Sequence, residues 1–478
     1  MSFRDANIII IETGRTAIRA GLGLHELLKT PGVEVAARVG LRADALNNGS
    51  QPAVKDYLVG SQLDEALATN SDVVVSWPFA EGQVKDWTQA EALWKYVLFN
   101  QLQRRRVQNE SPVLLSIMPG LSRQSYERIC QMFFERFNVA GFSVLERPVG
   151  QIYAANSLSG LVVDIGQFQT DIIPIAEGFI VQPARTSVSV GAWHCENYLA
   201  VLLRANQSVM AALSPPETEV DQAALHTTLV ELARQVWREG HVKVPSDGET
   251  IATEDDGVTD IAAVIVAGKE RALIESGMKK KATAKASAAE QARAREIEAL
   301  DLITVQFRDH SLTLGKERHR FCEPLFDPSL LRLVPPSLMT VSGHPASTGV
   351  LPWPLQEAAG HAVLQTEVDS RKYIWEGLFV TGEITQHVKG IGIALESRVA
   401  PFIAASELQT EVQARAVRVL NVPDYFPEYR DTGNGFAAFL GASITAKITF
   451  NEGRNYVSKM DYSSKGPHSI VESAAALL

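Results

Sequence analysis

The stretch that decides the fold is IIIIETGRTAIRAG, which occupies residues 8–21. Its β-branched apolar run ends in Glu12, a tight turn follows, and apolar residues then resume, so the stretch predicts a buried strand, a turn and a returning strand. The pattern recurs as GLVVDIGQFQTDIIPI at residues 160–175, where Asp164 takes the place of Glu12. The two acids stand 152 positions apart (164 − 12). We therefore predict two lobes of similar internal plan.

The segment between the two hairpins alternates helices with strands. Residues 86–104 place apolar side chains at helical spacing, and residues 112–117 form an apolar run typical of a buried strand. Ser122 can cap a helix over residues 123–137, and residues 142–145 predict a further short strand. This alternation indicates an α/β lobe.

Length and composition are those of a large folded protein. The 478 residues suffice for about three domains or two large lobes, and a hydrophobic content of 46% is enough to bury a core. The net charge of -10 argues against wholesale binding of nucleic acid or anionic membranes. The first apolar run is too short for a signal peptide, and no segment approaches the roughly 20 apolar residues of a membrane span. We expect a soluble intracellular protein with no membrane contact.

The cysteines and histidines give no sign of a disulfide framework or a metal site. Cys130, Cys195 and Cys322 lie 65 (195 − 130) and 127 (322 − 195) residues apart, which excludes a CxxC motif and favours a reducing compartment. The histidines lack metal-ligand spacing, and we expect His194, Cys195 and Glu196 to pack locally rather than to bind a metal.

Two segments have the character of surface insertions. Residues 246–260 carry six carboxylates and no basic residue, for a net charge of -6, whereas residues 279–295 carry six basic residues and one acid, for a net charge of +5 on an alanine-rich background. We interpret residues 246–300 as a solvated insertion, in preference to a nucleic-acid contact or a nuclear localisation signal. Residues 335–354, rich in Pro, Ser and Gly, predict a second insertion.

Six motifs occur in a fixed order along the chain. They are WPFAEGQVKDW at 77–87, the strand at 112–119, the hairpin at 164–178, FCEPLFDP at 321–328, FLGAS at 439–443, and SKMDY at 458–462 followed by KGP at 465–467. In this order they resemble the actin family over nearly the whole chain. The resemblance implies an α/β, actin-like fold of two lobes and four subdomains, the superfold shared with Hsp70 and sugar kinases. It also implies a nucleotide cleft between the lobes, where turn amides would bind phosphate and carboxylates would hold hydrated Mg²⁺.

The resemblance also implies where the parts of the molecule begin and end. Residues 1–155 together with 437–478 would form the first actin-like lobe, with its outer subdomain at about 34–76. Residues 156–436 would form the second lobe, and the insertions at 246–300 and 335–354 would belong to it.

The two hairpin turns depart from the family pattern at the positions that hold phosphate. Carried over residue by residue, Glu12 replaces the aspartate of the family, Arg15 replaces a small hydroxyl residue, and Arg19 replaces a lysine. Asp164 and Gly166 are kept, but Gln167 and Phe168 stand where the family has an acid and a glycine, and a phenylalanine does not adopt a glycine-type turn cheaply. The resemblance therefore implies a vestigial cleft, with its residues at Glu12, Gly14, Arg15, Arg19, Asp164, Gly166, Gly382 and Glu383.

The positions that would perform hydrolysis are also altered. Arg147 stands at the water-orienting glutamine of the family and Asp171 at its partner histidine, although phosphoryl transfer depends on such positioning groups. Glu383 replaces a glycine that lets the nucleoside base approach, and Gly435 replaces a lysine. We expect no catalytic residues, no metal, no ATPase activity and no required cofactor. ATP or ADP as a structural ligand, held by a modified but working site, is left open.

Within the actin family the chain is most similar to the fungal actin-related subunits of SWI/SNF and RSC chromatin remodelling complexes. The similarity lies in PDYFPEY at 423–429, TDIIPI at 170–175 and the acidic segment leading into 261–271. It implies a nuclear, noncatalytic subunit that regulates remodelling and transcription, pairs with actin-related protein seven and docks on the helicase-SANT-associated helix of the motor ATPase. Other remodeller subunits would be further partners, with DNA or the nucleosome reached only through the complex.

The motor helix would lie in an apolar groove at one end of the molecule, as an amphipathic helix-in-groove contact. By resemblance the groove residues are Tyr153, Val380, Phe436 and Phe439. Two other functions remain alternatives. The first is an active actin-like ATPase or filament-forming protein, in keeping with the intact overall plan and with YLVG at 57–60, and the more distant one is a sugar kinase.

Overall fold

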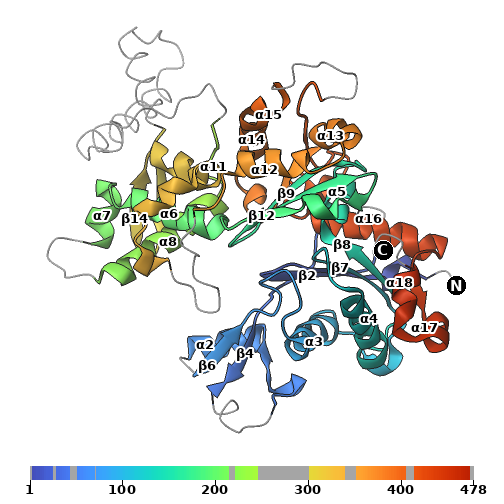
Figure 1. The fold of residues 1–478 in the computed structure, drawn as a ribbon. Helices are drawn as coiled ribbons and strands as arrows, with labels where there is room; N and C mark the ends of the chain where they lie inside the picture. Colours follow the sequence, from blue (N-terminus) through green and yellow to red (C-terminus); the bar gives the residue numbers. More distant parts are fainter. Residues whose placement is uncertain are drawn as a thin grey trace, which may run out of the picture.

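The computed structural model describes residues 3–24, 28–43, 51–69, 72–214, 221–245, 301–339, 351–404 and 414–473. Two six-stranded sheets form the centres of two lobes, with α5 (Arg147–Ala154) and α16 (Ala437–Glu452) packed between them (Figure 1). The α/β two-lobed architecture predicted from the sequence is confirmed. The insertion predicted at 246–300 lies outside the described residues, as do residues 340–350 of the second insertion. None of the helices within the described ranges is long and apolar enough to cross a membrane.

The first sheet is built around the hairpin at the start of the chain. β1 pairs antiparallel with β2 and parallel with β7, which pairs parallel with β8, and the strand order is β17-β8-β7-β1-β2-β3. Ile9 and Ile11 pack on one face beneath α3 and α4, whereas Ile8 and Ile10 pack on the other face with α16, so the central strands are buried on both sides. The strands are β1 (Ile9–Thr13), β2 (Ala17–Leu22), β3 (Val33–Ala36), β7 (Pro112–Ile117), β8 (Gly141–Glu146) and β17 (Val457–Ser458).

The helices of the first lobe begin where the sequence predicts. The Asp86 side chain accepts hydrogen bonds from the backbone N–H groups of Thr88 and Gln89, so α3 starts at Trp87. The chain continues from α3 into the π-helix η3, which ends at Gln101, three residues before the predicted end. Gln103 then adopts a φ of 52°, which a right-handed helix does not accommodate. Ser122 caps α4 as predicted. The elements are α3 (Trp87–Lys95), η3 (Tyr96–Gln101), α4 (Arg123–Gln131), η5 (Met132–Arg136), α17 (Lys459–Lys465) and α18 (Ser469–Ser473).

The second sheet repeats the plan of the first. β9 pairs antiparallel with β10 and parallel with β15, which pairs parallel with β16, and the order is β11-β10-β9-β15-β16, with β12 beside β10. The predicted similarity of the two lobes is thus confirmed in their sheets. The strands are β9 (Gly160–Ile165), β10 (Thr170–Ala176), β11 (Phe179–Ile180), β12 (Thr186–Val188), β15 (Leu378–Thr381) and β16 (Val419–Leu420).

The second lobe has one large apolar core that joins its sheet to the surrounding helices. Trp237, on α8, is buried at the centre of this core and stacks on Phe321, at 6.1 Å between ring centroids. The helices are α6 (Ala192–Leu203), α7 (Gln207–Leu213), α8 (Gln222–Arg238), α11 (Glu323–Phe326), α12 (Leu355–Leu364), α13 (Val368–Trp375), η10 (Glu383–Gln386), α14 (Ile391–Val399) and α15 (Pro401–Ala404).

Each lobe carries a smaller sheet at its outer end (Figure 1). In the first lobe the order is β5-β4-β6, and α2 packs on this sheet. In the second lobe β13 and β14 form an antiparallel hairpin. These elements are β4 (Val39–Arg42), β5 (Leu58–Val59), β6 (Val73–Ser76), α2 (Ser61–Ala68), β13 (Ile303–Phe307) and β14 (His310–Leu314).

The two lobes are joined by the close crossing of α5 and α16. A Cβ atom at Gly441 would overlap the backbone carbonyl of Gly150, so the two helices approach until their backbones touch. Leu440 packs toward the second sheet and Phe439 toward the first, which places α16 in the cores of both lobes. Side chains at the start of α5 therefore lie between the two hairpins.

Candidate functional site

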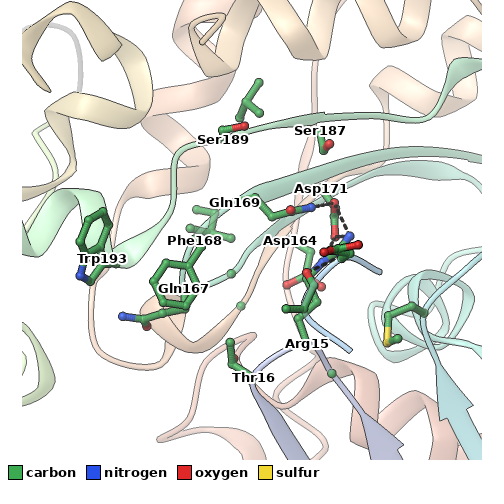
Figure 2. A pocket seen from close by; sticks show the side chains of 18 of the residues that line it. Arg15, Thr16, Asp164, Gln167, Phe168, Gln169, Asp171, Ser187, Ser189 and Trp193 are labelled. Carbon is green, nitrogen blue, oxygen red and sulfur yellow. Dashed lines mark hydrogen bonds and ion pairs between the residues drawn. The ribbon is translucent and has the colours of Figure 1, made fainter. Parts of the chain in front are cut away.

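A cavity of about 770 Å³ opens where the turns of the two hairpins face each other (Figure 2). It is lined by the end of β1, the start of α5, the end of β9, the start of β10 and the loop before η10. All the residues that the sequence analysis assigned to the vestigial cleft or to its altered hydrolytic positions line this cavity, namely Glu12, Gly14, Arg15, Arg19, Arg147, Asp164, Gly166, Asp171, Gly382 and Glu383.

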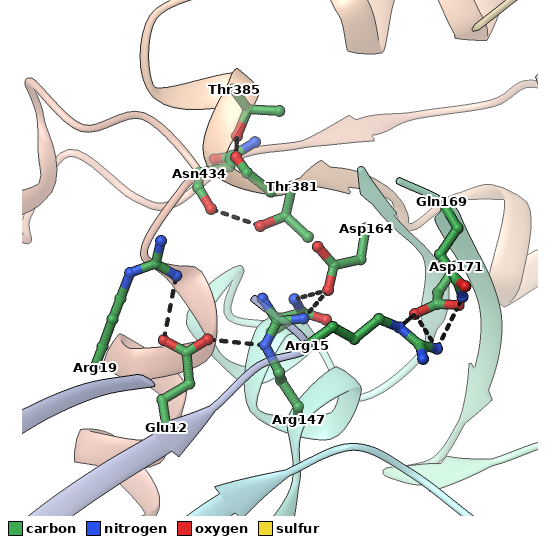
Figure 3. Close-up of polar contacts among 12 residues, drawn as sticks. Glu12, Arg15, Arg19, Arg147, Asp164, Gln169, Asp171, Thr381, Thr385 and Asn434 are labelled. Atoms are coloured by element: carbon green, nitrogen blue, oxygen red, sulfur yellow. Dashed lines mark hydrogen bonds and ion pairs between the residues drawn. The ribbon is translucent and has the colours of Figure 1, made fainter. Parts of the chain in front are cut away.

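Arg147 is the centre of the buried charge in this cavity. Its Nε donates to Glu12 Oε1 at 2.8 Å, and its Nη1 forms a very short contact with Asp164 Oδ2 (Figure 3). Gln151, one turn later on α5, donates from Nε2 to the same Asp164 oxygen at 2.9 Å. Burial lowers the pKa of Arg147, but Asp164 and Glu12 more than offset this and raise it. One arginine thus connects the acids of both hairpins.

Arg19 completes the charge balance on the first hairpin. Its Nη1 lies 3.6 Å from Glu12 Oε2 and its Nε donates to Glu34 Oε2 at 3.1 Å. Its guanidinium carbon lies 5.0 Å from the centre of the Phe436 ring, within cation–π range. Burial lowers the pKa of Arg19, whereas Glu12 and Glu34 raise it, and the net shift is upward.

Arg15 spans the cavity from the first hairpin to the second. From the turn after β1 its guanidinium reaches Asp171 on β10, with Nη2 3.0 Å and Nε 3.2 Å from Oδ2 (Figure 3). Its Nη1 donates to the carbonyl of Ala80 at 3.2 Å, and Gln169 Nε2 donates to Asp171 Oδ1 at 2.8 Å. Both side chains of the ion pair are 22% exposed. The pair is therefore a partly buried contact between the lobes.

The turn of the second hairpin is occupied by protein contacts. The backbone N–H groups of Ala192 and Trp193, at the start of α6, donate to the carbonyls of Gly166 and Gln167 at 3.0 and 2.9 Å. The Phe168 ring packs against Trp193, with 5.8 Å between the centroids. The first amides of α6, which could otherwise bind an anion, are thus used within the protein.

Glu383, which lines the cavity, belongs to a second charged pair. Glu383 Oε1 accepts from Arg238 Nη2 at 2.6 Å, which links η10 to α8. Gly382 has a φ of 114°, and a Cβ atom there would overlap the carbonyl of Ile165, so only glycine fits. Gly435 packs against the side chain of Gln386.

Several residues that contact the charged groups were not predicted from the sequence, namely Gln151, Glu34, Gln169 and Arg238. Gln151 carried a signal, because it lies four positions after Arg147 on a helix and must share its face. No sequence signal pointed to the other three, Glu34, Gln169 and Arg238, because strand register or tertiary packing alone brings them to the site. Among the described residues, no group of three or more His, Cys, Asp or Glu side chains could hold a metal ion. His194 accepts a hydrogen bond from the Gly191 backbone N–H at 3.2 Å, a local contact.

The groove residues assigned by resemblance need correction. Val380 and Phe439 are 2% and 3% exposed, because Val380 lies on a central strand and Phe439 faces the inner side of α16, so neither is accessible to a partner. Tyr153 and Phe436 are half-buried, and Phe436 lies against Arg19.

Exposed apolar side chains instead lie on the elements that pack beside α5, on which Tyr153 lies. Leu158 is 62% and Phe179 57% exposed, and the Leu158 carbonyl accepts from the Gly178 backbone N–H at 2.7 Å. Ile444 packs in the same cluster as Tyr153, and Ile448, one turn later on α16, is 53% exposed. We call Tyr153, Leu158, Phe179 and Ile448 the α5–α16 face.

Comparison with known proteins agrees with the fold. The family model described as Actin matches residues 4–475. The SWI/SNF and RSC complexes subunit arp9 of Schizosaccharomyces pombe is 27% identical over 98% of this chain and 99% of its own length. Actin-related protein 2 of Saccharomyces cerevisiae is 28% identical over 41% of this chain and 49% of its own length. With a family match that spans almost every residue, the chain belongs to the actin family.

Proposed function

We propose that this chain is a noncatalytic, actin-related subunit of a chromatin remodelling complex of the SWI/SNF and RSC type, which acts in the nucleus to regulate remodelling and transcription. The similarity to S. pombe arp9 along nearly the full length of both chains supports the subunit role. The observation that carries the noncatalytic part is the pairing of Arg15 and Arg147 with the carboxylates of the cleft.

The cleft residues do not fit a nucleotide with its metal. Asp164 would have to hold hydrated Mg²⁺, yet it contacts Arg147, so a metal there would meet the charge of a guanidinium. Arg15 lies across the space in front of its turn and contacts Gly82, where phosphate would need free backbone amides. Glu383 lines the cavity where the resemblance places the nucleoside, and its carboxylate pairs with Arg238. We expect neither hydrolysis nor a bound nucleotide cofactor, because phosphoryl transfer depends on positioning and charge stabilisation.

Nucleotide content and turnover of the purified full chain test the noncatalytic part. Mass spectrometry of the denatured protein should find no stoichiometric ATP or ADP, and phosphate release with added MgATP should equal the buffer blank. If phosphate is released above the blank, and Asp164→Ala abolishes the release, the chain is an active actin-like ATPase and the noncatalytic proposal fails.

The second part of the proposal concerns docking. The α5–α16 face is an exposed apolar surface at the junction of the two lobes, of the kind that accepts the apolar side of an amphipathic helix. We propose that the helicase-SANT-associated helix of the motor ATPase binds this face, with actin-related protein seven bound beside this chain on the same helix. A helix seated at the junction would contact elements from both lobes and so couple them to the motor.

Co-purification with a helicase-SANT-associated peptide, in the presence of actin-related protein seven, tests the docking. Ile448→Asp should reduce the peptide recovered at least tenfold, because it places a charge on the apolar face. Ile393→Asp is a matched control, since Ile393 is 56% exposed on α14 and lies outside the face. Equal loss in both variants, or no binding of the unaltered pair, would contradict the docking proposal.

A further inference from the structure

A run of three arginines, residues 104–106, lies at the surface of the first lobe, where Arg104 is half-buried and donates from Nε to the Leu102 carbonyl at 3.0 Å. It lies in the loop between η3 and η4 (Arg106–Gln108), after Gln103 has turned the chain with its positive φ. Arg105 and Arg106 are exposed, and Val107 beside them is 90% exposed. Within the ranges that the structure describes, Arg104, Arg105 and Arg106 form no ion pair with a carboxylate. Their charges are therefore available to a partner.

Side-chain hydrogen bonds join the loop to its surroundings. Arg106 Nη2 donates to the Glu135 carbonyl on η5 at 2.9 Å, and Asn138 Nδ2 donates to the Arg106 carbonyl at 2.8 Å. Lys459 Nζ, at the start of α17, donates to Asn138 Oδ1 at 2.9 Å. These contacts join three segments that are distant in sequence into one continuous surface.

We call the exposed residues of this surface the arginine strip, namely Arg105, Arg106, Val107, Arg136, Lys459 and Met460. Met460 is 79% exposed, so two large apolar side chains stand among four cations. Two nearby carboxylates form hydrogen bonds outside the strip, because Glu135 Oε1 accepts from the Tyr462 hydroxyl at 2.9 Å and Asp461 Oδ2 accepts from the Ser458 backbone N–H at 3.0 Å. With Glu110, which is also exposed, they reduce but do not cancel the charge of the four cations. In a chain with a net charge of -10, the strip is a local positive region.

We propose that the arginine strip is a docking surface for an acidic polypeptide segment in which carboxylates alternate with apolar side chains. Unpaired exposed guanidinium groups attract carboxylates and bind them with two parallel hydrogen bonds. The exposed Val107 and Met460 side chains favour a polypeptide over a nucleic acid, since a phosphate backbone offers them no apolar contact. This surface is separate from the α5–α16 face and goes beyond the function proposed above.

Fluorescence anisotropy with the full chain and a labelled peptide of repeated Asp-Glu-Leu units tests this assignment. The double variant Arg105→Glu with Arg106→Glu should weaken peptide binding about tenfold or more, because two attractive contacts become repulsive. The control double variant Arg123→Glu with Arg332→Glu changes the net charge equally at two other exposed positions and should bind as the unaltered chain does. Thermal unfolding establishes that both variants are folded.

The apolar part of the strip has its own test. Val107→Ser with Met460→Ser should weaken binding of the Asp-Glu-Leu peptide several-fold and leave binding of polyglutamate of equal length unchanged. The proposal is overturned if the arginine and control variants lose affinity equally. It is also overturned if polyglutamate binds as well as the mixed peptide, or if duplex DNA displaces the mixed peptide at equal charge concentration and salt.

Discussion

The β1–β2 and β9–β10 hairpins place charged side chains at matching positions of their ladders, but they balance these charges differently. In β1–β2, Glu12 stands opposite Arg19, and the two form an ion pair within the hairpin. In β9–β10, Asp164 stands opposite Asp171, so two like charges face each other. Like charges directly opposite destabilise an antiparallel pair. The second hairpin therefore depends on cations from elsewhere.

Those cations come from the first lobe and from the helix between the lobes. Arg15, from the turn of the first hairpin, pairs with Asp171, and Arg147, from the start of α5, pairs with Asp164. The two facing carboxylates of the second hairpin are thus each paired with an arginine from across the cleft. We infer that these pairs hold the two lobes together across the cleft.

The largest effect should follow from removing Arg147. Arg147→Met leaves Glu12 and Asp164 buried without their shared cation, and breaking a buried charge pair in this way costs about 3–5 kcal/mol of unfolding free energy. Denaturant unfolding of the full chain measures it. A loss below about 1 kcal/mol would show that the two acids do not depend on Arg147.

The helix α6, which begins against the turn of the second hairpin, should give the stability of the protein a pH dependence. His194, in the helix that begins against the turn of β9–β10, accepts a hydrogen bond from Gly191, and burial lowers its pKa to about 4. The unfolded state binds this proton more readily, so the stability from neutral His194 is full above about pH 6.5 and falls as the pH drops toward about 4. Because the ring is partly exposed, we expect a loss of about 2 kcal/mol.

Unfolding free energies at pH 7 and pH 5 measure this effect. His194→Gln, which keeps a hydrogen-bond acceptor but has no charge to gain, should make the loss of stability between these pH values smaller. The remaining loss comes from other groups, among them His226, His319 and His387, whose pKa values burial also lowers. If the profile of the variant matches that of the unaltered chain, His194 is not the group responsible.

The Arg15–Asp171 pair should contribute less than Arg147, because both side chains are 22% exposed. A double-mutant cycle of Arg15→Ala and Asp171→Ala should give a coupling free energy of about 1–2 kcal/mol, the range for charge-assisted hydrogen bonds with some exposure. Arg15→Ala should also widen the cleft, measured as an increase in the radius of gyration in solution scattering. A coupling near zero, with an unchanged radius, would show that the pair does not hold the lobes.

The sequence was sufficient to predict which residues line the cleft, but not which of them form ion pairs with one another. The repeated strand, acid and turn located Glu12 and Asp164, and family motifs located Arg147 and Asp171. The partners of Arg147 lie 135 and 17 residues away, so their contact depends on how α5 is set between two sheets. Val380 was misplaced for a related reason. Its apolar character fits a groove as well as a core, and only the position of β15 between β9 and β16 decides that it is buried.

The smallest effect should come from the charged pair that stays within one lobe. Arg238 and Glu383 are 50% and 34% exposed and both belong to the second lobe, so their separation exposes no unpaired buried charge and opens no cleft. Arg238→Ala should cost less than about 1 kcal/mol of unfolding free energy, as is usual for surface pairs, and added salt should reduce the difference further. If Arg238→Ala costs as much as Arg147→Met, ion pairs between the lobes do not stabilise the protein more than a pair within one lobe. If Arg238→Ala costs little unfolding free energy and Arg147→Met costs much, the ion pairs that stabilise the protein are those between the two hairpins.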